Sequence, residues 1–304
     1  MAPTIEKLCG NFKLGEAPFW DESSQVLYFV DINGYTINKY DPKTKKHTSA
    51  YVGKNVSIII PVKGKKDQFV ITLERELMLV TWDGVSPKPS KMVKLLEVDQ
   101  NTKNVFNDGK CDPSGKLWIG TMGGPPVVIA DIPLGKGTLY SIQNKKSTPH
   151  LTGIGIANGL AFNTELKKMY YIDSRTGTVD QYDWDTNKGS ISNGTPIFTA
   201  KKNGLDGMVF DGMTIDTDGN LYVAVWGSRV IKIDPKKPET LLDTFHMPAK
   251  IISSVCFGGA NLDELYVTSG QVGITPGPDD GATFKITGIN AKGFAEVPVD
   301  LEKM

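Results

Sequence analysis

Apolar and polar residues alternate along most of the chain, as they do in β-strands that bury one face. The segment 23–42, SSQVLYFVDINGYTINKYDP, shows the basic unit, which is an apolar and aromatic strand, a turn, a second strand and a polar exit. Turns rich in Gly, Asp, Asn and Pro bound the strands, and the sequence contains no long amphipathic helix pattern. The pattern predicts an all-β protein.

This unit recurs six times, at intervals of roughly 40 to 50 residues, which is the length of a propeller blade repeat. The copies are centred on Tyr28, Val70, Trp118, Tyr170, Tyr222 and Tyr266. Because one unit cannot bury both of its faces, we expect six four-stranded sheets to pack radially as a six-bladed β-propeller. Residues 1–304 are predicted to form a single domain. The segments around TIEKL (4–8) and GFAEVPVDL (293–301) are expected to share one blade and close the ring.

Composition and charge narrow the classes of partner. The 34 basic and 34 acidic side chains cancel, and no block of Lys and Arg favours nucleic acid or an anionic membrane as the main partner. No apolar run reaches the roughly 18 residues that a membrane helix needs, and the first residues are charged where a signal peptide has an apolar core. Cys9, Cys111 and Cys256 lie far apart, which indicates free thiols in a reducing compartment. We therefore expect a cytoplasmic protein that binds a small molecule, and a monomer, because a closed propeller needs no partner.

Polar residues stand at equivalent places before the six repeat centres. Counting back 11 to 13 positions reaches Glu16, Ser57, Asn107, Asn158, Asp211 and Ser253 or Ser254. In a propeller this segment is the innermost strand of a blade, and its entry end faces the central channel. The register therefore directs two carboxylates, two amides and two hydroxyls toward one place. Trp20, Trp118 and Trp226 are interpreted as blade packing.

Two carboxylates that face each other in a narrow channel repel, unless one takes up a proton or a cation lies between them. Ligands with oxygen atoms alone favour Ca²⁺ and also suit Mn²⁺ and Mg²⁺, whereas Zn²⁺ would need added waters. The register predicts Glu16, Asn158 and Asp211 as the metal ligands. This set leaves coordination positions open for water and substrate, as a catalytic metal requires. The alternative is a solvated channel, in which the polar side chains hold only water.

Several segments, taken in order, resemble the signatures of one known family. They are GEAPFWD (15–21), FNDGKCDPSG (106–115), GTM (120–122), ANGLAF (157–162), YYIDS (170–174) and DGMTIDTDGNLYVA (211–224). Over essentially the whole chain they resemble the family of senescence marker protein, gluconolactonase, regucalcin and luciferin-regenerating enzyme. Three further segments resemble the insect luciferin-regenerating branch more than vertebrate regucalcin: LERELMLVTWDGVS (73–86), LLDTFHMPAK (241–250) and GGANLDELYVTS (258–269).

The resemblance implies a six-bladed propeller with one divalent metal in the channel. It places the family's metal ligands on Glu16, Asn158 and Asp211, and a substrate-side ligand on Asn107. Family members that act on sugar lactones commonly carry Arg where this chain has Val105 and an acid where it has Pro125. Both family residues contact sugar hydroxyls. The resemblance therefore implies that Val105 and Pro125 line a less polar substrate site, which suits a flatter and less polar molecule than a sugar lactone.

The leading hypothesis is a divalent-metal-dependent hydrolase of a lactone or a related small cyclic ester. The ion would polarise the carbonyl, Asp211 would act as general base, and Asn107 would hold a substrate oxygen. One alternative is a luciferin-regenerating enzyme that acts on oxyluciferin-like heterocycles. The other is a non-catalytic, regucalcin-like protein that binds calcium or a small ligand, which the apolar residues Val105 and Pro125 favour.

Overall fold

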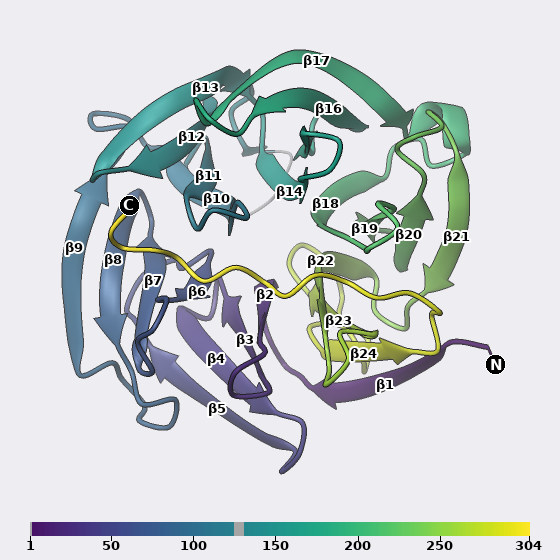
Figure 1. The fold of residues 1–304 in the computed structure, drawn as a ribbon. Helices are drawn as coiled ribbons and strands as arrows, with labels where there is room; N and C mark the ends of the chain where they lie inside the picture. The colour runs from purple at the N-terminus through teal and green to yellow at the C-terminus, as the bar shows by residue number, and fades with distance from the viewer. Residues whose placement is uncertain (1, 125–130) are drawn as a thin grey trace.

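The computed structural model describes residues 2–124 and 131–304, which form a ring of six sheets with four strands in each (Figure 1). Within each sheet, sequential strands pair antiparallel, so each of the first five blades is one continuous stretch of chain. The all-β, six-bladed propeller predicted from the repeats is confirmed. In that part of the chain, no helix is both long and apolar enough to cross a membrane.

From the channel outward, the first five blades consist of β2 to β5, β6 to β9, β10 to β13, β14 to β17 and β18 to β21, and the sixth of β22, β23, β24 and β1. The strands are β1 (Thr4–Cys9), β2 (Gly15–Asp21), β3 (Val26–Asp31), β4 (Thr36–Asp41), β5 (Lys46–Tyr51), β6 (Ile59–Pro61), β7 (Gln68–Leu73), β8 (Glu76–Thr81), β9 (Lys91–Glu97), β10 (Val105–Cys111), β11 (Leu117–Met122), β12 (Gly137–Gln143), β13 (Lys146–Ile154), β14 (Ala157–Asn163), β15 (Lys168–Asp173), β16 (Thr178–Asp185), β17 (Ser190–Thr199), β18 (Val209–Ile215), β19 (Leu221–Trp226), β20 (Arg229–Ile233), β21 (Leu241–His246), β22 (Ile251–Gly258), β23 (Glu264–Gly270) and β24 (Thr283–Thr287). A short 3₁₀-helix, η2 (Lys201–Asn203), follows β17.

The ring closes where the N-terminal strand joins the last blade. β1 pairs with β24 along its length, with Thr4 opposite Thr287. The expectation that the segment 293–301 also belongs to this blade is wrong. That segment makes only isolated bridges to two other blades, because β1 already occupies the outer edge of β24. Figure 1 shows it in yellow, crossing one face of the ring.

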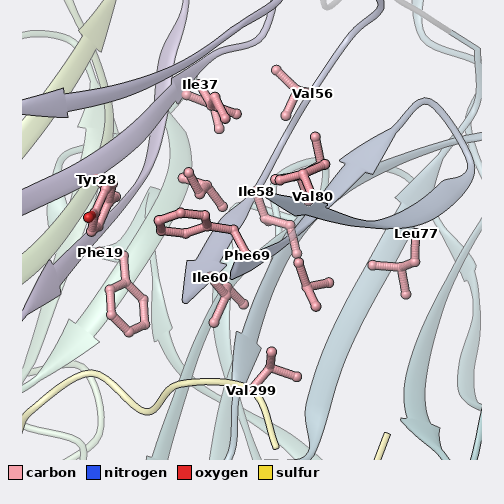
Figure 2. Close-up of a cluster of buried hydrophobic side chains, with 14 of the residues drawn as sticks. Phe19, Tyr28, Ile37, Val56, Ile58, Ile60, Phe69, Leu77, Val80 and Val299 are labelled. Atoms are coloured by element: carbon pink, nitrogen blue, oxygen red, sulfur yellow. The ribbon is translucent and has the colours of Figure 1, made fainter. Parts of the chain in front are cut away.

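Apolar side chains fill the space between neighbouring blades. The six repeat centres all lie on the second strand of a blade and are all buried. Between the first two blades, the rings of Tyr28 and Phe69 meet edge to face with their centroids 4.9 Å apart. Figure 2 shows Phe19 and Ile60 beside them, and Val299 from the C-terminal segment at the border of the same cluster. The core therefore consists of packed blade interfaces. The inner strands surround the channel.

Phe69 offers a test of this inter-blade packing. Its side chain is 2% exposed, so Phe69→Ala removes apolar contacts from both blades and leaves a cavity. We expect the free energy of unfolding to fall by about 3–5 kcal/mol, measured by urea denaturation with circular dichroism. Val85→Ala is the control: this side chain is 59% exposed, and a surface truncation changes stability by about 0.5 kcal/mol or less. Equal losses in the two variants would contradict the packing described.

Candidate metal centre

The inner strands of five blades carry β-bulges at the polar residues that the register singles out. The register shifts fall between Glu16 and Phe19 in β2, Phe106 and Gly109 in β10, Asn158 and Leu160 in β14, Phe210 and Met213 in β18, and Ile252 and Ser254 in β22. A bulge leaves one residue out of the ladder and changes the direction of its side chain. The bulges therefore account for side chains near the starts of these strands that point into the channel.

Glycine follows Asn158 and Asp211, and it allows the inner strands to lie close together around the axis. A Cβ atom at Gly212 would be 2.8 Å from Ser254 Cα, and one at Gly159 would be 2.7 Å from the carbonyl oxygen of Asp211. Neither position accepts a side chain without displacing the neighbouring strand. The Asp211–Gly212 pair is therefore part of an inner strand and not a turn.

The structure brings the three predicted metal ligands together with Asn107. Glu16, Asn107, Asn158 and Asp211 line one small cavity of about 70 Å³ at the entry end of the inner strands. Glu16 is 7% exposed, and Asn158 and Asp211 are each 4% exposed. The side chain of Asn107 is half-buried, and its Nδ2 donates a hydrogen bond of 2.8 Å to the carbonyl oxygen of Ala157. This bond fixes the amide at the edge of the carboxylate pair.

Burial raises the pKa values of Glu16 and Asp211 well above their ordinary values. The Asp211 and Asp108 carboxylates raise the pKa of Glu16 further, whereas the N–H of Ala17, 2.9 Å from Glu16 Oε2, lowers it. Trp226 Nε1 donates a hydrogen bond of 2.6 Å to Asp211 Oδ2, which opposes the rise in the pKa of Asp211. The protein alone thus disfavours two negative charges at this place.

Asp108, which is half-buried, adds a third carboxylate near Glu16 and Asp211. Burial raises its pKa to about 6, and the ammonium of Lys110 opposes the shift. Lys110 Nζ in turn lies 3.0 Å from Glu296 Oε1, an ion pair inside the channel. The cation that lowers the pKa of Asp108 is therefore already paired with another carboxylate.

The donor set fits a hard divalent cation. Asn158 Nδ2 donates to Ser174 Oγ at 2.7 Å, and Ser174 Oγ donates to the carbonyl oxygen of Phe210 at 2.7 Å. Asn158 Oδ1 is buried and has no hydrogen-bond partner among residues 2–124 and 131–304, a state that costs about 1–3 kcal/mol. A cation between this amide oxygen and the two carboxylates would satisfy all three, and oxygen ligands of this kind suit Ca²⁺, Mg²⁺ and Mn²⁺. Within the described residues no three His, Cys, Asp or Glu side chains form a metal cluster, so the set consists of two acids and an amide.

The wall of this cavity is mostly apolar. Its apolar members are Leu14, Ile32, Met122, Ile132, Ile156, Val209 and Val272. Val105 does not line the cavity directly; it is buried behind the wall in one cluster with Met122, Ile132 and Ile156. Pro125, the other predicted substrate-side residue, lies outside the described residues. The apolar surface expected at Val105 is thus formed by its neighbours Met122, Ile132 and Ile156.

Two residues of the site were missed at the sequence level. Trp226, interpreted as blade packing, donates its indole N–H to Asp211, and Ser174 orients the amide of Asn158. The hairpin of β18 and β19 could have indicated the contact of Trp226 with Asp211. Trp226 lies opposite Val209, which is two residues before Asp211. The hydroxyls of the register do not line the cavity: Ser57 meets Thr72 Oγ1 at 3.0 Å, and Ser253 donates to a backbone carbonyl at 2.6 Å.

Comparisons with known proteins agree with the motifs. A family model described as "SMP-30/Gluconolactonase/LRE-like region" matches residues 14–271. The chain is 35% identical to regucalcin of Homo sapiens over 293 residues, with 94% of each chain covered. It is 34% identical to regucalcin of Danio rerio over 292 residues, with 93% of each covered. A solved luciferin-regenerating enzyme shares 45% identity and a TM-score of 0.93, with 99% of this chain and 100% of that chain covered. The family resemblance is confirmed.

The buried acids predict a specific dependence of stability on pH. The raised pKa values of Glu16 and Asp211 mean that the folded protein binds more protons than the unfolded chain above pH 4.5. Without added metal, stability therefore falls as pH rises toward the folded pKa values. Glu16→Gln should raise the free energy of unfolding at pH 8 in chelator, by about 1.4 kcal/mol for each unit of pKa shift removed.

Urea denaturation at pH 5 and pH 8 measures this effect. The control is Glu165→Gln, which removes an exposed carboxylate and should leave the difference between the two pH values unchanged. A Glu16→Gln protein that is less stable than the wild type at pH 8 in chelator would contradict the electrostatic account.

Proposed function

The chain belongs to the SMP-30/gluconolactonase/LRE-like family, and from this premise we propose that it is a divalent-metal-dependent hydrolase of a lactone or a related small cyclic ester. One observation carries the proposal: two buried carboxylates meet, at the entry end of the channel, a buried amide oxygen to which no described residue donates a hydrogen bond. Such a group is unfavourable in a purely structural role and suits a cation that substrate can reach.

Glu16, Asp211 and Asn158 would hold the ion, and Ca²⁺ is the ion we expect, with Mn²⁺, Mg²⁺ and Zn²⁺ as the alternatives to assay. When bound, a divalent ion supplies Lewis-acid polarisation of the substrate carbonyl. Ser174 and the N–H of Ala17 would fix the orientations of Asn158 and Glu16 through the hydrogen bonds already described.

Asp211 would act as the general base. It takes the proton from the water that attacks the lactone carbonyl, the ring C–O bond breaks, and the released ring oxygen takes up a proton. Trp226 holds Asp211 Oδ2 at 2.6 Å, so that the carboxylate keeps one orientation. Asn107, which lines the same cavity, would hold a substrate oxygen through its amide.

The apolar wall bears on the class of substrate. Met122, Ile132 and Ile156 offer no hydrogen bonds, so several sugar hydroxyls would lose water there without gaining partners. A lactone with an aromatic or alkyl body would instead bury apolar surface. We therefore propose an aryl or alkyl lactone as substrate, in preference to a sugar-acid lactone.

Two alternatives share this site. The 45% identity to a luciferin-regenerating enzyme and the apolar wall favour a second candidate, cleavage of an oxyluciferin-like heterocycle. The third candidate is a protein that binds metal and ligand without turnover. Only an activity assay distinguishes this function from the other two.

The first prediction from this proposal concerns substrate and metal. Dihydrocoumarin, glucono-1,5-lactone, phenyl acetate and an oxyluciferin-like heterocycle are each assayed with Ca²⁺, Mn²⁺, Mg²⁺, Zn²⁺ or a chelator. We expect metal-dependent turnover that is abolished in chelator, with kcat/KM higher for dihydrocoumarin than for the sugar lactone. Turnover of the heterocycle alone would favour the second candidate, and metal binding without any turnover the third.

Asp211→Asn should lower kcat about 10²- to 10⁴-fold, which is the typical contribution of a general base. The matched control is Asp218→Asn, an exposed acid in the hairpin turn that follows β18, and its kcat should not change. An Asp211→Asn protein that keeps the wild-type kcat would rule out this mechanism.

Trp226→Phe tests how Asp211 is positioned. It removes the indole donor to a buried carboxylate, a hydrogen bond worth about 1.5–3 kcal/mol, so kcat/KM should fall roughly 10- to 100-fold. Trp184→Phe is the matched control, because the Nε1 of this buried indole donates a hydrogen bond to no residue that the structure describes. If the two variants lose activity equally, the bond from Trp226 has no special role in positioning Asp211.

A further inference from the structure

A cavity much larger than the one at the candidate metal centre lies at the other end of the inner strands. Its volume is about 690 Å³, against about 70 Å³ at the candidate metal centre. It opens where β10, β14 and β18 end, at Cys111, Asn163 and Ile215, whereas the candidate metal ligands stand near the starts of their strands. Small-molecule sites commonly measure about 300–1,000 Å³, so this far-face cavity has the size of a ligand site.

The C-terminal strap, defined as residues 293–299, forms one wall of the far-face cavity. It is attached at both ends: Gly293 N donates to the carbonyl oxygen of Leu262 at 2.8 Å, and Val299 N donates to that of Pro61 at 2.9 Å. Between these attachments, Phe294 to Val297 face the cavity. Figure 1 shows the strap crossing the face of the ring, so the wall bridges separate blades.

Apolar side chains make up much of the lining. Phe162 and Ile215 form part of it and are 7% and 8% exposed. Phe294 on the strap and Leu166 on the facing hairpin also line the cavity, but they are 55% and 42% exposed. A flat apolar molecule between these side chains would remove both exposed groups from water, which is favourable in proportion to the apolar area covered.

Two N–H donors meet beside Gly219 in the same lining. A Cβ atom at this position would lie 3.2 Å from Asn163 Nδ2 and 3.6 Å from Lys236 Nζ. Gly219 has a φ of +84°, a backbone conformation that disfavours any side chain and so keeps this corner open. Asn163 Oδ1 already accepts the N–H of Leu166 at 2.9 Å, so the amide presents its nitrogen to the corner.

Among the described residues that line the far-face cavity, the ammonium of Lys236 has no carboxylate partner. The carboxylate of Asp216 lies 3.1 Å from Lys232 Nζ, and that of Glu296 lies 3.0 Å from Lys110 Nζ. Across residues 2–124 and 131–304, Lys236 forms no ion pair; its Nζ donates to the backbone carbonyl of Asp218 at 2.8 Å. The remaining carboxylates of the lining, Glu165 and Asp218, are exposed at the rim, where water and salt screen them.

We propose that the far-face cavity is a second small-molecule site, which binds a flat, apolar molecule that carries one carboxylate. The carboxylate accepts hydrogen bonds from Asn163 Nδ2 and Lys236 Nζ, and the apolar body lies between Phe162, Ile215 and Phe294. Binding here does not depend on the proposed hydrolase activity, because the two sites lie at opposite ends of the inner strands.

Isothermal titration calorimetry with 2-naphthoate tests the proposal on the full chain. We expect binding at one site per chain, and a Kd at least about tenfold higher in Lys236→Met, which corresponds to about 1.4 kcal/mol. Lys237→Met is the matched control, since Lys237 is also exposed and lies outside the lining, and the Kd of this variant should equal that of the wild type. Phe294→Ala should also raise Kd, because it removes part of the apolar wall.

Two further titrations locate the site and its polarity. Glu16→Gln, at the candidate metal centre, should leave the Kd of 2-naphthoate unchanged, and the neutral 2-naphthamide should bind at least about tenfold more weakly. No binding up to about 1 mM, loss of binding in Glu16→Gln with retention in Lys236→Met, or equal affinity for the acid and the amide would each overturn the proposal.

Discussion

Closure of the ring is the constraint on which the channel depends. β1 adds to the outer edge of β24, with Thr4 opposite Thr287 and Lys7 opposite Phe284, so hydrogen bonds join the first strand of the chain to the last blade. The candidate metal centre takes Glu16, Asn107, Asn158 and Asp211 from four different blades. Side chains that are far apart in the sequence therefore meet only while the ring is closed. A change that opens the ring would separate the residues of the site.

The polar groups of the candidate metal centre lower the stability of the folded protein when no metal is bound. Burial and neighbouring carboxylates raise the pKa values of Glu16 and Asp211, and Asn158 Oδ1 has no hydrogen-bond partner among the described residues. In other proteins, replacing buried ionic groups with well-packed hydrophobic residues is often neutral or stabilising, so these acids are not explained by stability. The hydrogen bonds from Trp226 and from the N–H of Ala17 only partly offset the penalty. A cation that binds the folded protein alone would stabilise it by mass action, so the same residues would couple metal binding to folding.

The two ends of the inner strands have different chemistry. At the entry end, acids and amides lie under an apolar wall, which suits a cation and a substrate of low polarity. At the other end, Glu296 of the C-terminal strap pairs with Lys110, and Phe294 of the strap forms part of the wall of the larger far-face cavity. The bulges separate these two environments along strands of only a few residues, because they turn side chains out of the regular alternation at the entry end alone.

Much of the fold and of the candidate site follows from the sequence, because strand alternation and turn residues act locally and the repeat brings equivalent offsets to equivalent places. That reasoning predicts six blades and directs Glu16, Asn158 and Asp211 to one place, and in the structure six sheets form and the three residues line one cavity. It does not predict the bond from Trp226 to Asp211 or the path of residues 293–301. These depend on where a bulge turns the backbone and on which sheet edge is still free, and both are decided by contacts between blades. The sequence determined the repeating unit and the acids; only the closed ring decided what each acid touches.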